Sequence, residues 1–186
     1  MKTTAIIFLA VLSLCASCEL HDKQNDPSPV TPPTPPSEQS EIPAALKGQW
    51  MYGNFSMTEF WAYDGSYQGN AFQTSVAFNF IPGGNFEMYF AASSTYYYCT
   101  TQAFTFKKGS VKFNDDHSFI IYPSEGRYRG YYSCASSSNI DRPFQPSELK
   151  PDTLYWSFEN DSYGKEYLVI RNEINDGPSY FRPVKW

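Results

Sequence analysis

Large apolar residues occupy every second position in many short segments of this chain after residue 49. In one segment Val76, Phe78 and Phe80 alternate with smaller or polar residues. A β-strand places alternate side chains on opposite faces, whereas a helix needs a period of about 3.6 residues. The spacing therefore predicts strands with one buried face. The other segments with this spacing are 86–90, 104–106, 111–113, 154–158 and 168–170.

Short sequences typical of turns separate these segments, and no long stretch carries a helical stripe. We expect at most one helical turn, at 147–150. The pattern predicts an all-β domain, an antiparallel meander of roughly eight to ten strands. The expected turns are Asp64-Gly65, Pro82-Gly83-Gly84, Lys108-Gly109, Asn114-Asp115-Asp116, Glu125-Gly126, 161–164 and Asp176-Gly177.

A sheet of this size must protect the unpaired backbone groups of its edge strands. Closed barrels and two-layered sandwiches both do so. Because most neighbouring segments are joined by short turns, we expect closure into a barrel; a β-sandwich is the alternative. The long polar connection 135–151 is expected to lie across the barrel mouth or rim. The 15 Phe, 15 Tyr and 4 Trp also favour strands over helices.

The first residues have the pattern of an export signal. Lys2 precedes an apolar run at 5–14, which is too short to span a membrane. Cys15-Ala16-Ser17-Cys18 resembles a bacterial lipobox with cleavage before Cys18. Residues 1–17 are therefore expected to be a lipoprotein signal peptide, and Cys18 the lipidated residue that anchors the chain. The alternative is an ordinary signal peptide with an incidental cysteine.

A proline-rich segment without aromatic residues separates Cys18 from the domain. Residues 18–41 are expected to form a disordered tether, since so little apolar surface cannot offset the entropy of ordering. Its prolines favour an extended spacer over a ligand for a proline-binding module. Residues 42–186 then form one domain. The formal net charge of −5 argues against nucleic acid and an anionic bilayer surface as partners.

The start of the domain resembles a known family. Gly48 and Trp50, in Leu46-Lys47-Gly48-Gln49-Trp50, are similar to the Gly-x-Trp opening strand of lipocalin-type barrels. In that family the tryptophan closes one barrel end and packs under an arginine near the last strand, which implies barrel-closing roles for Trp50 and Arg171. No long helix follows the strands as in secreted lipocalins, so a sibling barrel without a lipocalin ligand is also compatible. Further similarity to lipocalin-like lipoproteins of Bacteroidetes lies in Glu59-Phe60-Trp61, Asp64-Gly65-Ser66-Tyr67, Gly84-Asn85-Phe86-Glu87 and Tyr155-Trp156.

The cysteines divide by position. Cys15 leaves with the signal peptide and Cys18 receives lipid, so Cys99 and Cys134 remain in the domain. Two cysteines in an exported domain most simply form a disulfide bond. The alternative is a pair of free thiols.

Residues for catalysis are sparse. His21 lies in the tether and His117 in an expected hairpin tip, so a nucleophile has few candidate bases. Asp115-Asp116-His117 is better interpreted as a solvated turn than as a metal site. We expect no enzyme, metal or cofactor; a hydrolase with two carboxylates is the lowest-ranked alternative. Asp152-Thr153-Leu154 resembles a short O-glycosylation signal of exported Bacteroidetes proteins.

Aromatic and arginine side chains are the candidates for ligand binding. They either pack across strands or form an aromatic platform at the barrel mouth for a small apolar or saccharide ligand. The arginines would supply charge-assisted donors or stand in solvent. The candidate residues are Trp61, Tyr63, Tyr97, Arg127, Arg129 and Tyr132.

Together these features predict a non-enzymatic lipoprotein of the bacterial cell envelope, anchored through Cys18. The outer membrane is the expected location, with its periplasmic face and the cell surface both open. The alternative is an accessory lipoprotein with a filled barrel that docks to another envelope protein.

Overall fold

The computed structural model describes residues 40–64 and 74–186, and within them nine strands pair in one antiparallel sheet with a single α-helix. The predicted signal peptide, Cys18 and all but the last two residues of the tether lie outside the described residues. The prediction of an all-β antiparallel domain is confirmed, and nine strands fall in the expected range. The strands are β1 (Gly48–Tyr52), β2 (Ser75–Ile81), β3 (Asn85–Tyr96), β4 (Cys99–Phe113), β5 (Ser118–Tyr132), β6 (Ile140–Pro143), β7 (Asp152–Asn160), β8 (Glu166–Arg171) and β9 (Ser179–Val184).

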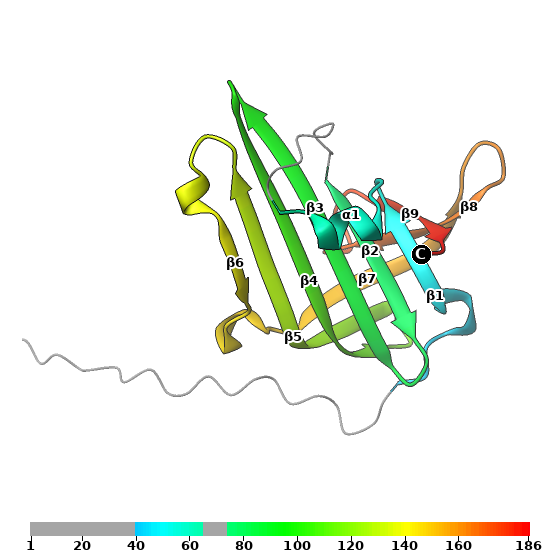
Figure 1. Ribbon diagram of the computed structural model, residues 1–186. Helices are drawn as coiled ribbons and strands as arrows, with labels where there is room; N and C mark the ends of the chain where they lie inside the picture. Colours follow the sequence, from blue (N-terminus) through cyan, green and yellow to red (C-terminus); the bar gives the residue numbers. More distant parts are fainter. Residues whose placement is uncertain (1–39, 65–73) are drawn as a thin grey trace, which may run out of the picture.

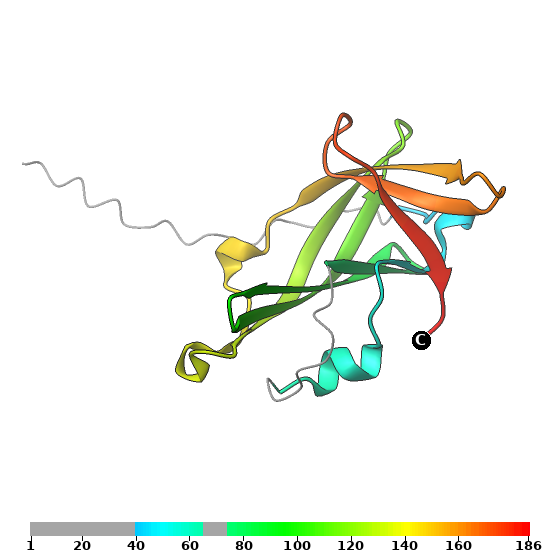
Figure 2. The same ribbon diagram turned by 90° about the horizontal axis from the view of Figure 1, so that it is seen from above.

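Eight of the strands form a closed ring. The pairing order is β4-β3-β2-β1-β9-β8-β7-β5, and β4 also pairs with β5. Figure 2 shows β7 and β8 across the ring from β3 and β4. Such a ring is consistent with both the expected barrel and the alternative sandwich. The remaining strand, β6, pairs with β5 outside the ring, along Arg127–Gly130 (Figure 1).

Aromatic side chains fill much of the ring interior. Phe78 and Phe80 of β2 point inward and stack with ring centroids 5.6 Å apart, as the alternation predicts. Trp50 also faces inward, and its indole Nε1 donates to the Leu46 carbonyl at 3.0 Å. Leu46 ends the 3-10 helix η1 (Ala44–Leu46), so the chain before β1 adds apolar cover to the interior. The other buried residues of this cluster are Ile42, Phe86, Val111, Phe119, Ile121, Leu154, Leu168, Ile170 and Phe181.

The helix α1 (Met57–Ala62) packs on the outside of the ring, over β3 and β4 (Figures 1 and 2). Ser56 caps it by accepting a bond from the backbone N–H of Glu59. Phe60 is its buried anchor, and it meets Tyr89 and Phe104 edge to face at 5.4 and 5.5 Å. In the described part of the chain, no helix is both long and apolar enough to cross a bilayer.

At two of the expected turns, Lys108-Gly109 and Glu125-Gly126, the chain continues as a long strand. Gly109 lies within the 15-residue β4, and Gly126 lies within the 15-residue β5. The register between these strands shifts at Lys108/Gly109, which is the mark of a β-bulge. A Cβ at Gly109 would collide with the Tyr122 carbonyl, so the glycine permits close approach of two backbones. The prediction of turns there was wrong because glycine occurs both in turns and where two strand backbones approach closely.

The long connection 135–151 also differs from expectation. It contributes β6 and the short 3-10 helices η2 (Ser136–Ser138) and η3 (Pro146–Glu148), the second of which overlaps the expected helical turn. Arg142 holds η3 by donating both Nη groups to the Glu148 carboxylate at 2.7 and 2.8 Å. The segment thus widens the sheet beside β5.

Candidate functional site

A cavity of about 370 Å³ opens where β1 and β8 end and β7 and β9 begin. Its walls are largely apolar, and Phe181 lies there between Tyr52 and Phe78, with centroids 5.9 and 5.8 Å away. The volume is within the range of sites for small molecules. The apolar lining residues are Tyr52, Val76, Phe78, Met88, Phe90, Leu154, Ile170 and Phe181.

Polar residues border this cavity on only part of its rim. Asp152 and Asn172 are exposed there, and Ser179 is half-buried. A mainly apolar wall with a few polar groups at its edge suits a ligand with an apolar body. None of the candidate ligand-binding residues identified from the sequence lines this space.

Arg171 also borders the cavity, but its guanidinium is held on the outer face of the sheet. It donates to Glu159 at 2.9 Å and to Ser157 Oγ at 3.4 Å. The hydrogen bond from Arg171 is the main cause that lowers the pKa of Glu159. Because Trp50 points into the ring, the structure does not bring Trp50 and Arg171 together as the family resemblance implies.

Three of the candidate residues meet at the end of α1 instead. Arg129 of β5 is only 6% exposed, and its guanidinium donates to the carbonyls of Phe60, Trp61 and Tyr63. It also lies 5.1 Å from the ring centroids of Phe60 and Phe104. The last carbonyls of a helix have no partner within it, so Arg129 satisfies this end of α1. The cluster of Trp61, Tyr63 and Arg129 has a packing role in the structure.

Arg127 lies one strand step from Arg129 but in a different environment. Its Nε donates to Asp141 of β6 at 2.7 Å, and both side chains are about half exposed. The hydrogen bond to Asp141 is the main cause that raises the pKa of Arg127. The two arginines therefore do not converge on one ligand position.

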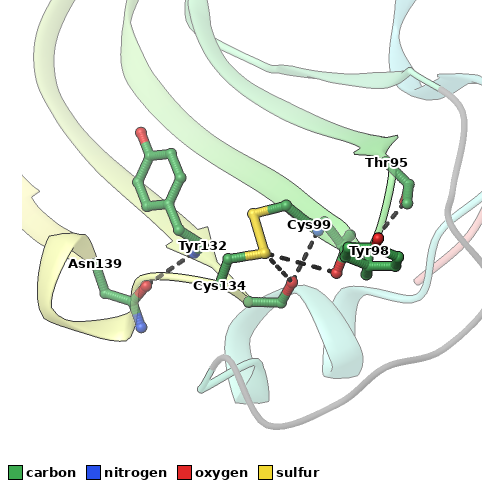
Figure 3. Close-up of a disulfide and its surroundings, with 8 residues drawn as sticks. Thr95, Tyr98, Cys99, Tyr132, Cys134 and Asn139 are labelled. Atoms are coloured by element: carbon green, nitrogen blue, oxygen red, sulfur yellow. Dashed lines mark hydrogen bonds between the residues drawn. A yellow bond between two sulfur atoms is a disulfide. The ribbon is translucent and has the colours of Figure 1, made fainter.

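The last two candidates, Tyr97 and Tyr132, each precede by two residues a cysteine of the disulfide bond between Cys99 and Cys134, whose Cα atoms are 5.2 Å apart. Figure 3 shows Tyr132 beside this bond. The bond agrees with the predicted pairing. Tyr97 lies in the turn between β3 and β4, and Tyr132 ends β5. This end of the sheet is remote from the cavity lining.

Acidic and histidine side chains form no metal-binding group within 40–64 and 74–186. His117 lies in the turn between β4 and β5, 4.9 Å from the Trp156 ring. Asp116 accepts from both the backbone N–H and the hydroxyl of Ser118, which lowers its pKa. The turn is therefore organised by its own hydrogen bonds. Thr153, in the possible glycosylation signal, is exposed in β7.

One element of the site region, α1, has a sequence signal at its start. Ser56 and Glu59 have the Ser-x-x-Glu spacing of a helix start, which would have predicted α1. Met88 and Leu154 follow the alternation, but their meeting at a cavity depends on long-range pairing. Comparisons of the chain with known families, characterised proteins and solved structures find no match.

Proposed function

We propose that the chain is a non-enzymatic, lipid-anchored binding protein of the bacterial cell envelope, with a lipocalin-like barrel. Its ligand is a small and mainly apolar molecule that enters the cavity at the open end of the ring. The observation that carries this proposal is the cavity of about 370 Å³ with its apolar wall. Cys18 is the anchor, and the outer membrane is the location.

The distribution of polarity supports binding of an apolar body. Phe78 and Phe181 are 2% exposed and Leu154 is 5% exposed, so the inner wall is well shielded. Removing apolar surface from water contributes about 25 cal/mol per Å². The polar residues Asp152 and Asn172 at the rim are placed to select the polar end of a ligand.

The fluorescent probe 1-anilinonaphthalene-8-sulfonate tests this proposal, because its emission rises in apolar sites. We expect saturable binding to the full chain with one probe per molecule. Replacing Met88 by tryptophan fills the cavity and should weaken binding at least tenfold. Tyr163→Trp is the matched control, since Tyr163 is 93% exposed and lies in the turn before β8.

Far-ultraviolet circular dichroism of each variant shows whether the fold is retained. Equal probe affinity in Met88→Trp and Tyr163→Trp, with the fold intact, would contradict binding in the cavity. That result would favour the alternative function, an accessory lipoprotein that docks to another envelope protein.

A further inference from the structure

Three consecutive tyrosines stand out from the end of the β3–β4 hairpin. Tyr96 ends β3, and Tyr97 and Tyr98 form the two-residue connection to Cys99. Their exposed fractions are 75%, 77% and 91%. The rings of Tyr96 and Tyr97 meet edge to face at 4.6 Å, so they contact each other more than the domain. Packing across strands, the ordinary role of tyrosine in sheets, does not account for these side chains.

The hairpin tip is held rigidly. The disulfide bond joins Cys99 to Cys134, and the hydroxyls of Thr95 and Thr100 are 2.9 Å apart across the strands (Figure 3). The backbone N–H of Thr100 also donates to Ser133 Oγ at 2.8 Å. A rigid surface loses little conformational entropy when it binds.

Tyr97 has an unusual backbone conformation for its residue type. Its φ is +52°, in the left-handed region that glycine adopts most easily. For a residue with a Cβ this region is less favourable than the right-handed region. Glycine would fit this turn better, so a tyrosine at the position indicates use of the ring itself.

The two described segments that meet at this end of the sheet contain no charged residue. In the sequence no Lys, Arg, Asp or Glu occurs in 91–106 or 130–140, which are the segments that meet at this end. They are instead rich in serine and threonine. A charged partner would gain no ion pair here, whereas hydroxyl groups suit a neutral, polar one.

The size of the tip favours a carbohydrate over a protein. A stable protein interface buries about 800 Å² on each partner. One aromatic side chain buries roughly 150–250 Å², so three of them fall short of that area. A single pyranose ring, in contrast, can lay its apolar C–H face on one tyrosine and direct its hydroxyls to the surrounding serines and threonines.

The position of the tip also suits an extended polymer. Ser40 enters the domain at the other end of β4, where its Oγ accepts a bond from the Phe113 backbone N–H at 3.1 Å. At about 3.4 Å per residue, the 15 residues of β4 separate the two ends by about 45–50 Å. If Cys18 anchors the chain, its tether joins the domain at the end of β4 opposite the tyrosines.

We infer that Tyr96, Tyr97 and Tyr98 form a second binding site, separate from the cavity, which stacks on the pyranose rings of a neutral polysaccharide. Thr95, Thr100 and Ser133 provide hydroxyl groups at its base. The site does not depend on whether the ring cavity binds a ligand, so the two proposals can fail independently.

Affinity electrophoresis of the full chain in gels that contain neutral polysaccharides tests this inference. The gels contain soluble β-glucan, galactomannan or α-mannan, with alginate as an anionic comparison. We expect at least one neutral polymer to retard the wild-type protein and alginate not to do so. Loss of retardation by at least tenfold is expected for Tyr97→Gly and for Tyr98→Ser.

The glycine variant separates binding from folding. Tyr97→Gly removes the ring and relieves the backbone, so its melting temperature should equal or exceed that of the wild type. Tyr163→Ser removes an equally exposed tyrosine elsewhere and should keep the retardation. Unchanged retardation of Tyr97→Gly and Tyr98→Ser would overturn the inference. So would a lack of retardation of the wild type in every neutral gel, or equal retardation by alginate.

Discussion

The guanidinium of Arg129 donates to the main-chain carbonyl of Phe60, which lies 69 positions earlier in the sequence. This contact ties α1 to the outside of β5. The same guanidinium lies 5.7 Å from the Trp61 ring centroid, so it contributes both hydrogen bonds and cation–π contacts. An arginine expected to face solvent or ligand therefore completes a second apolar cluster outside the ring.

Replacing Arg129 by glutamine should destabilise the domain by about 2–4 kcal/mol, because buried carbonyls at the end of α1 lose their charged donor. Urea denaturation gives the free energy of unfolding that checks this value. Arg127→Gln is the control, since it breaks an exposed ion pair that contributes at most about 1 kcal/mol. Equal losses in the two variants would contradict the structural role of Arg129.

Joint replacement of Cys99 and Cys134 by serine should lower the free energy of unfolding by about 2–4 kcal/mol. The bond joins residues with a sequence separation of 35. Without it the unfolded chain gains conformational entropy, so folding becomes less favourable. Urea denaturation measures the loss. Peptides that contain the two cysteines should be found joined by mass spectrometry before reduction, and finding them only as separate peptides would refute the bond.

The Glu148 carboxylate should make the free energy of unfolding decrease as the pH falls below 4.5. The hydrogen bonds from Arg142 are the main cause that lowers its pKa from 4.5 to about 2, and a bond from the Gln145 backbone N–H adds to them. Because the folded pKa is the lower one, this stabilisation is present above pH 4.5 and is lost as the pH falls towards 2. The difference in melting temperature between the wild type and Glu148→Gln should therefore shrink over that range.

Arg142→Gln provides the test of this cause. It removes the main donor but leaves the Gln145 N–H bond, so the melting temperature of Arg142→Gln should depend on acid less than that of the wild type and more than that of Glu148→Gln. A melting-temperature difference between wild type and Glu148→Gln that is constant from pH 4.5 to 2 would contradict the assigned cause.

The alternation of apolar residues predicted β2, β7, β8 and parts of β3 and β4, but not β5, β6 or β9. Phe78 and Phe80 point into the ring because a period of two puts them on one face of β2. The environment of Arg129 was not accessible in the same way, since it is set by α1, a helix of six residues that is too short for a periodic stripe. Local pattern fixes which side of a strand a residue occupies, but distant segments decide what covers it.

The cavity, too, could not be predicted from the local sequence pattern. Leu154 and Ile170 alternate correctly with their neighbours, and the sequence places both on the inner face. Whether inner residues meet or leave space depends on the packing of strands that are far apart in the chain. Aromatic and charged side chains such as Trp61 and Arg129 serve packing as well as binding, so their residue type alone does not mark a ligand site.

Gly109 offers a test of the bulge that replaced an expected turn. Changing it to alanine should destabilise the domain by about 1–3 kcal/mol, because the new Cβ would collide with the Tyr122 carbonyl in β5 and force the two backbones apart. Gly177→Ala is the control, since a Cβ there would meet nothing within 4 Å. Urea denaturation of both variants compares the effects. If Lys108-Gly109 were an exposed turn instead, Gly109→Ala would change stability no more than Gly177→Ala does, and the continuous β4 strand would be wrong.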